Sequence, residues 1–199
     1  WPIMLHALGL EPSKQIFGHP WLLFGNDKMS KSKGNIVYAD DLVNKYGVDA
    51  IRYYMLHEIP FASDGNFTME LLENSINSDL ANVLGNLVNR TLGMINKYFD
   101  GCVENKKVNT ELDDKFINTV LGSKEKVEKN MEHLRVADAL EEIFNVFRVC
   151  NKYIDDNEPW VLIKDETKVD RLKTVLYNLC EAIRYESVLL QAFLPDTAE

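Results

Sequence analysis

Cysteine is scarce in this sequence, and the three cysteines, Cys102, Cys150 and Cys180, are isolated from one another. They form no Cys-x-x-Cys pair and have no histidine nearby at the spacing of metal ligands, which argues against a disulfide framework or a cysteine-based metal centre. We therefore predict small buried thiols in a reducing, cytoplasmic compartment and no metal site within these residues.

Long hydrophobic runs are also missing, since no apolar stretch approaches the roughly 20 residues that a transmembrane helix requires. Residues 1–6 lack the basic n-region of a signal peptide. A hydrophobic content of 46% with 27% charged residues is ordinary for a soluble globular protein. The sequence thus predicts a protein without a membrane partner.

Positive charge is in deficit, and the formal net charge is −9. Such a balance argues against a general nucleic-acid coat, although it leaves room for a local basic or hydrogen-bonding footprint on one face. The 199 residues can form one large domain or two small ones. No internal repeat or low-complexity tract divides them.

One short stretch is rich in positive charge: Lys28, Lys31 and Lys33 fall within six residues, separated by serines and a methionine. Gly-Asn pairs lie on both sides, and both residue types tolerate left-handed backbone angles, so we expect a loop that can move. Lysines on such a loop can neutralise charge that develops on a departing pyrophosphate. The alternative is a solvated basic turn.

The residues around this basic loop (residues 27–35) predict an α/β arrangement. Residues 3–8 are expected to end a helix that Gly9 closes. Lys14 to Phe24 has the aromatic and branched residues of a strand. Helices are expected over 40–46, capped by Asp40 or Asp41 and ended by Gly47, and over 50–57, capped by Asp49. A strand that ends in a phosphate-handling loop is typical of open α/β sheets, which bind ligands beyond the carboxyl ends of their strands.

From Thr68 onward, long amphipathic helices replace this pattern. Because the loops between them are short, they predict an antiparallel bundle. The expected fold is therefore mainly α, with residues 1–67 and 68–199 as two domains. The helices are expected over 68–98, with Thr68 at the start and Asp100-Gly101 as the stop, and over 116–134, 136–154 and 169–193. Pro159 is expected in a first helical turn.

Two features of the expected bundle can read bases. Asn82, Asn86 and Arg90 share one helix face because they are spaced by four residues, and amide and guanidinium groups recognise base edges. Trp160 follows Glu158-Pro159 and can stack on a base, an interaction of about 1–3 kcal/mol. The alternatives are a solvated polar face and a tryptophan that fills the core.

The run Lys-Met-Ser-Lys-Ser from Lys28 resembles the signature of class I aminoacyl-tRNA synthetases. Over essentially the whole chain, further motifs follow the order and spacing of methionyl-tRNA synthetases. They are Trp1-Pro2-x-Met4, Gly18-His19, Tyr46-Gly47-Val48-Asp49-Ala50-x-Arg52-Tyr53-Tyr54, Asn86-Leu87-x-x-Arg90 and Glu158-Pro159-Trp160. The loop alone also fits class I synthetases for other amino acids.

This resemblance implies the C-terminal edge of a Rossmann-type α/β catalytic domain with a stem-contact region, followed by an anticodon-binding bundle. ATP with magnesium, methionine and tRNA(Met) are the implied substrates and partners. By the same resemblance, Lys28 and Lys31 are catalytic and stabilise the departing pyrophosphate. Asn86, Arg90 and Trp160 contact the CAU anticodon. The implied ATP-binding residues are Lys28, Met29, Ser30, Lys31 and Ser32.

Other parts of such an enzyme are not in this sequence. The His-Ile-Gly-His-type motif, the methionine pocket and a zinc-bearing insertion lie upstream in the family, so zinc is expected only there. We therefore expect a C-terminal portion of a methionine–tRNA ligase that is inactive alone. A class I synthetase for another amino acid and a non-catalytic tRNA-binding module are the alternatives. No oligomeric state follows from the sequence.

Overall fold

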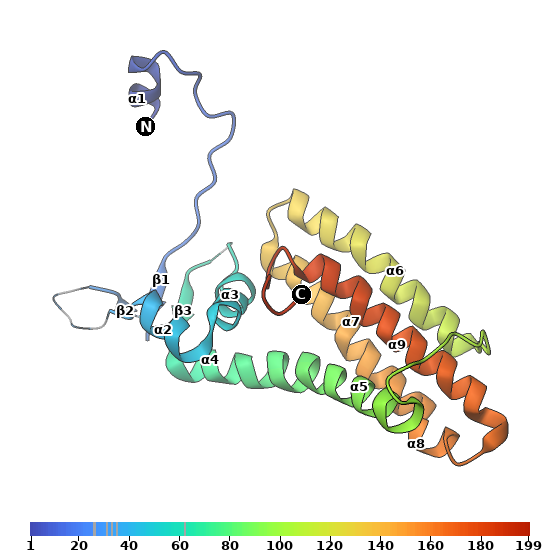
Figure 1. The fold of residues 1–199 in the computed structure, drawn as a ribbon. Helices are drawn as coiled ribbons and strands as arrows, with labels where there is room; N and C mark the ends of the chain where they lie inside the picture. Colours follow the sequence, from blue (N-terminus) through green and yellow to red (C-terminus); the bar gives the residue numbers. More distant parts are fainter. Residues whose placement is uncertain (26, 31, 33, 35, 62) are drawn as a thin grey trace.

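The computed structural model describes residues 1–25, 27–30, 32, 34, 36–61 and 63–199. It is mostly helical, with a small three-stranded sheet near the N-terminal end (Figure 1). Within those ranges, no helix combines the length and the apolar character needed to cross a membrane.

The first 21 residues form an N-terminal arm that extends away from the remaining structure (Figure 1). The expected helix is confirmed as α1, Pro2–Ala7, and Gly9 follows it with a φ of +66°. The strand expected from Lys14 was wrong for residues 14–21, which have no ladder partner among the described residues. Strand propensity alone does not form a ladder, and Pro20 has no N–H to donate to one.

The sheet consists of β1 (Leu22–Phe24), β2 (Asp27–Lys28) and β3 (Gly65–Phe67), in the order β2-β1-β3. The central strand β1 pairs antiparallel with β2 and parallel with β3. A glycine is required at the start of β3, because a Cβ on Gly65 would lie 2.3 Å from the Ile59 side chain.

Two helices connect the parallel strands: α2, Ala39–Tyr46, and α3, Val48–His57. Gly47 separates them with a φ of +84°, so the predicted stop of the first helix is confirmed. The predicted aspartate caps were wrong, because both helices begin earlier and Asp49 lies inside α3. A small apolar cluster centred on Tyr54, Phe67 and Leu72 holds this part together.

One long helical stretch follows, made of α4 (Met69–Ser75), the π-helical segment η2 (Ile76–Gly85) and α5 (Asn86–Phe99). The predicted start is confirmed, because Thr68 Oγ1 accepts a hydrogen bond from the Leu71 amide at 3.1 Å. Asp100 ends α5 in the left-handed conformation, also as predicted. The π-helical segment was not predicted.

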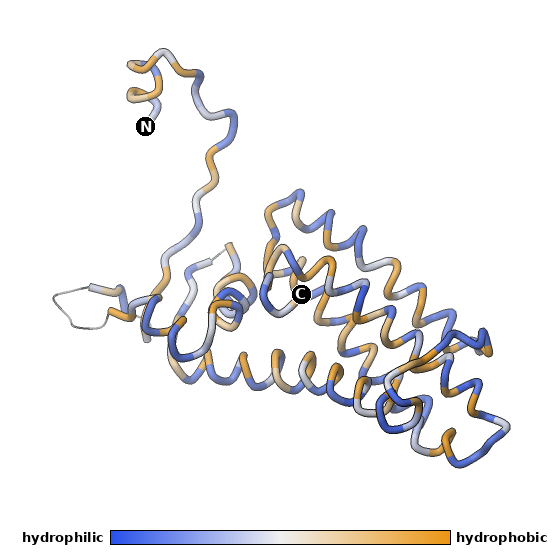
Figure 2. The backbone as a smooth tube through the Cα atoms, viewed as in Figure 1, coloured by the Kyte–Doolittle hydropathy of each residue, from blue (hydrophilic) through white to orange (hydrophobic). Residues whose placement is uncertain are grey.

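The remaining helices pack beside one another and against α5, with their apolar faces turned inward (Figures 1 and 2). Helix α6 starts five residues earlier than predicted because Thr110 and Asp113 form a capping box there. The elements after α5 are α6 (Glu111–Glu132), α7 (Val136–Asn157), α8 (Pro159–Leu162), η3 (Glu166–Lys168) and α9 (Val169–Leu190). Together with α4, η2 and α5 they make up residues 68–199, which we call the helical region.

The chain terminus ties the helical region to α3. Arg52 donates from Nε to the carbonyl of Phe193 at 2.6 Å and from its terminal nitrogen to the carbonyl of Ala192 at 3.2 Å. The Asp49 carboxylate accepts a hydrogen bond from the Thr197 amide at 2.6 Å. These bonds span more than 130 residues of sequence, so they fix how α3 sits on the helices.

Candidate functional site

The basic loop begins at the sheet, where Lys28 is the last residue of β2 and pairs with Leu23 of β1. The Lys28 ammonium lies 4.1 Å from the centre of the Trp21 ring, a cation–π contact that orients it. The Ser30 and Ser32 hydroxyls are 3.1 Å apart. The structure thus places three predicted loop residues at one edge of the sheet.

Met29 is half-buried, and its side chain lines a small apolar depression with Leu22 and Phe67. This contact connects the loop to the cluster under the sheet. Lys31 and Lys33, two of the three predicted ammonium groups, lie outside the described residues.

Arg90 projects from α5 toward the end of α7. Its terminal guanidinium nitrogen lies 2.6 Å from Asp155 Oδ1, and a little over a quarter of the Arg90 side chain is exposed. Because the carboxylate holds one side of the guanidinium, the remaining donors keep a fixed direction. The pairing joins residues that are 65 positions apart in the sequence.

Asn86 lies one helical turn before Arg90 on α5, and it is exposed. Asn89 of α5 and Asn82 of the preceding π-helical segment η2 are also exposed, so all the residues of the predicted polar face lie on the surface, but only Asn86 and Arg90 are one α-helical turn apart on α5. The opposite stripe is buried through Leu87, Thr91 and Ile95, as the amphipathic pattern predicts.

Trp160 lies on the short helix α8, just after α7 ends. Glu158 forms the turn in the left-handed conformation, with φ of +44°, and Pro159 occupies the first position of α8 and is buried. Trp160 is 41% exposed. The structure therefore leaves a face of this indole open, whereas a tryptophan that filled the core would be buried.

These placements bring Arg90 and Trp160 to the same end of α7. Asp155, which holds Arg90, is five residues from Trp160 and lies in the last two turns of that helix. Asn86 lies one helical turn before Arg90 on α5. The sequence did not indicate Asp155 as the link, since an Asp in an acidic run carries no signal of a partner on another helix.

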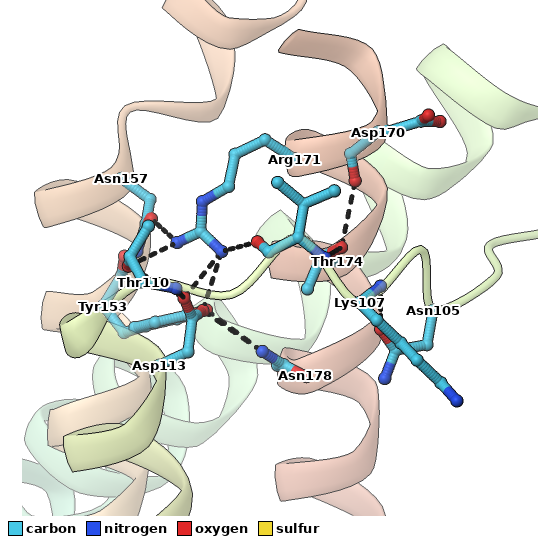
Figure 3. Close-up of polar contacts among 11 residues, drawn as sticks. Asn105, Lys107, Thr110, Asp113, Tyr153, Asn157, Asp170, Arg171, Thr174 and Asn178 are labelled. Atoms are coloured by element: carbon cyan, nitrogen blue, oxygen red, sulfur yellow. Dashed lines mark hydrogen bonds and ion pairs between the residues drawn. The ribbon is translucent and has the colours of Figure 1, made fainter.

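A buried polar network joins the last turns of α7 to α6 and α9 through Tyr153 and Asn157 (Figure 3). Asp113 is fully buried and forms an ion pair with Arg171 at 2.7 Å. Its carboxylate also accepts hydrogen bonds from Tyr153, Asn178 and Thr110. Burial raises the pKa of Asp113, but the hydrogen bonds from Arg171 and Tyr153 outweigh that effect and hold the pKa below its ordinary value.

A second polar cluster lies where α3 meets α7. His57 contacts Glu58 at 2.7 Å and Glu141 at 3.0 Å, while Arg148 lies 3.2 Å from Asp79. His57, Glu58 and Asp79 are close enough to hold a metal ion, but each already has an oppositely charged or hydrogen-bonding partner. Their geometry is that of an ion-pair junction between helices.

Residues 1–92 match the family model described as tRNA synthetases class I (M), so this part has the sequence features of a class I aminoacyl-tRNA synthetase. Residues 103–199 match the model of the anticodon binding domain of methionyl tRNA ligase. With these two matches, the chain belongs to the methionyl-tRNA synthetase family.

Individual relatives with high identity to the chain are also methionyl-tRNA synthetases. The chain is 55% identical to the methionine–tRNA ligase of Clostridium tetani, with all of this chain but 31% of that protein covered. It is 49% identical to the Bacillus subtilis enzyme, covering 30% of it. The structure superposes on Mycobacterium tuberculosis methionyl-tRNA synthetase in complex with methionyl-adenylate with a TM-score of 0.93. That match has 39% identity and covers all of this chain and 39% of that one. The chain thus spans about a third of the length of its relatives.

Proposed function

We propose that this chain is the C-terminal portion of a methionine–tRNA ligase, in which it supplies the ATP loop and reads the CAU anticodon of tRNA(Met). In this proposal, residues 1–67 are the edge of a Rossmann-type catalytic domain with its stem-contact region. Residues 68–199 are the antiparallel anticodon-binding bundle. The complete enzyme activates methionine with ATP and transfers it to the tRNA.

The observation that supports anticodon reading most strongly is the corner at the end of α7. There Arg90, held by Asp155 at 2.6 Å, lies near the turn that presents an open face of Trp160. In the proposal, Trp160 stacks on one anticodon base, while Asn86 and Arg90 hydrogen-bond to base edges. Rigid aromatic and guanidinium groups suit this role because little side-chain freedom is lost on binding.

In the same proposal, the basic loop handles ATP. The residues Lys28, Met29, Ser30, Lys31 and Ser32 bind the nucleotide, and Lys28 and Lys31 stabilise the pyrophosphate as it departs. The described loop residues fit phosphate oxygens: the Lys28 ammonium and the paired Ser30 and Ser32 hydroxyls are donors. Magnesium, which arrives with the phosphates of ATP, neutralises their charge.

The arm supports the view that the loop belongs to a larger catalytic domain. Helix α1 has no buried residue, and Ile3 and Leu8 are 83% and 70% exposed. Figure 2 shows this apolar segment standing clear of the other elements. Exposed apolar patches of this kind mark surfaces that other parts of a protein cover. We therefore expect negligible ATP–pyrophosphate exchange by these 199 residues, and robust exchange would contradict the proposal.

The direct test compares binding of this chain to tRNA(Met) and to the same tRNA with a changed anticodon, at one stated salt concentration. We expect CAU to bind more tightly and Trp160→Ala to remove most of the preference, since stacking on a base contributes about 1–3 kcal/mol. Trp21→Ala is the matched control, because Trp21 is exposed but lies on the arm. Equal binding of both tRNAs by the unmodified chain would refute anticodon reading.

A further inference from the structure

The end of α7 is anchored by a hydrogen bond between Asn157 and Arg171 of α9, and neither of these residues belongs to the surface formed by Asn86, Arg90 and Trp160. Asn157, the last residue of α7, accepts a hydrogen bond through Oδ1 from Arg171 at 2.5 Å. Its amide nitrogen donates to the carbonyl of Tyr153 at 2.9 Å. Both the oxygen and the nitrogen of the Asn157 side-chain amide thus have hydrogen-bond partners, and Trp160 follows only three residues later in the sequence.

Arg171 is itself held on its other side (Figure 3). One terminal nitrogen lies 2.7 Å from Asp113 Oδ2 and donates to the carbonyl of Val108 at 2.9 Å, while the other reaches Asn157. Only 12% of the Arg171 side chain is exposed. Because both terminal nitrogens of the guanidinium have partners, it cannot rotate without breaking several hydrogen bonds. Arg171 of α9 therefore holds α6, through Asp113, and α7, through Asn157, in fixed positions.

The turn beyond Asn157 has little freedom of its own. Glu158 adopts a left-handed conformation that a residue with a Cβ rarely takes, and Pro159 fixes the next φ. Because this turn is rigid, the orientation of the last turn of α7 sets the direction in which α8 presents the Trp160 indole. The same turn carries Asp155, the partner of Arg90.

We propose that Arg171, held by Asp113, is a positioning residue for the anticodon-reading corner: it anchors Asn157 and thereby fixes the direction of Trp160. Neither Arg171 nor Asp113 touches the RNA in this proposal. The link to tRNA rests on the function proposed above, whereas the effect on Trp160 is a property of the chain alone. A purely structural pair would alter stability without altering the indole.

The first experiment needs no RNA. In a chain carrying Trp1→Phe and Trp21→Phe, Trp160 is the sole tryptophan, and its fluorescence anisotropy and acrylamide quenching report its mobility. We expect Arg171→Gln and Asn157→Ala to lower the anisotropy and to increase quenching about twofold, approaching an open indole. Asn157→Asp should give values between those of Asn157→Ala and the unmodified chain, because its carboxylate still accepts the Arg171 bond but cannot donate to the Tyr153 carbonyl.

Arg184→Gln is the matched control, because Arg184 lies on the same helix, is largely exposed and pairs only with Glu181 among the described residues. It should leave Trp160 unchanged. Should Arg171→Gln fail to fold, the Asn157 variants decide the question, since they leave the Asp113–Arg171 pair intact. Unchanged Trp160 mobility in folded Asn157→Ala would overturn the positioning role.

The second experiment measures the ratio of dissociation constants for the changed anticodon and for CAU. Asn157→Ala should lower that ratio about tenfold, equivalent to 1.4 kcal/mol, and Asn157→Asp, which keeps only the Arg171 bond, should lower it less. If Trp160 becomes mobile but the unmodified chain shows no preference for CAU, the proposed function fails while the positioning role stands. If the preference exists and Asn157→Ala leaves it intact, the positioning role is wrong.

Discussion

The N-terminal arm and the helical region differ in how they are stabilised. The helices enclose a continuous core in which Leu140, Phe144 and Leu176 are fully buried. The arm exposes most of its large apolar side chains and contributes no buried residue from α1. The helical region therefore has the contacts that a stable fold requires, whereas the arm has apolar surface that needs a partner. This difference suggests that the two regions perform separable tasks.

The largest effect is expected at the buried ion pair of the helical region. Asp113→Ala leaves the nearly buried Arg171 without its counter-charge, and breaking such a pair costs about 3–5 kcal/mol. Urea unfolding followed by circular dichroism measures the loss. Asp138→Ala is the control, because Asp138 and its partner Arg135 are both more than half exposed. Equal small losses for the two variants would show that the buried network does not stabilise the fold.

A pair of leucine substitutions compares the buried core of the helical region with the exposed N-terminal arm. Leu176→Ala opens a cavity in the core and should cost about 2–5 kcal/mol of unfolding free energy. Leu8→Ala, at an exposed position of the arm, should change it by less than about 0.5 kcal/mol. Comparable losses in the same urea titration would mean that the arm packs on the structure in solution.

A pH effect is expected from Glu186, whose side chain is fully buried. Ser123 donates to one carboxylate oxygen at 2.7 Å, while the other has no hydrogen-bond partner within the described ranges. Burial raises the pKa of Glu186 to about 7. Between the ordinary carboxyl pKa and this value, the folded chain binds more protons than the unfolded chain, so stability falls as pH rises through that window.

The variant Glu186→Gln keeps the shape of the side chain but cannot ionise. At pH 8 it should be more stable than the unmodified chain by up to about 3 kcal/mol, and the difference should shrink toward pH 5. Thermal unfolding at a series of pH values measures this. A pH-independent difference would show that Glu186 does not titrate in that window.

The smallest effect is expected at His57, where α3 meets α7 of the helical region. Although burial lowers the pKa of His57, its hydrogen bonds with Glu58 and Glu141 outweigh that and raise it. The protonated form therefore stabilises the contact at acidic pH, and the contribution is lost as pH rises through the raised pKa. His57→Gln should cost about 1 kcal/mol at pH 5.5 and less at pH 9. An unchanged cost at both values would contradict this.

Local signals predicted much of the fold. The Thr68 cap, the Asp100-Gly101 stop and the position of Pro159 in a first helical turn are confirmed, because capping and turn chemistry depend on neighbouring residues. The strand from Lys14 was overextended, because a ladder requires a partner that the local pattern cannot supply. The π-helical segment Ile76–Gly85 has the same amphipathic pattern as its neighbours and was missed.

The resemblance to a known family identified the candidate site residues, but the sequence did not identify the residues that hold them in place. The sequence gives no sign that Asp155 would meet Arg90, or that Arg171 would join Asp113 to Asn157. Such contacts depend on how α5, α6, α7 and α9 pack, which periodicity does not specify. The roles of Asn86, Arg90 and Trp160 remain predictions, as do those of Lys28 and Lys31.

The most direct test of the account uses an RNA that can reach only the helical region. An isolated anticodon stem-loop carrying CAU lacks the acceptor end that a catalytic domain binds. We predict that this chain discriminates the stem-loop from its changed-anticodon counterpart by the same ratio as the two complete tRNAs, at one fixed salt concentration. Discrimination with complete tRNAs but none with the stem-loops would contradict the central claim that the corner at the end of α7 reads the anticodon.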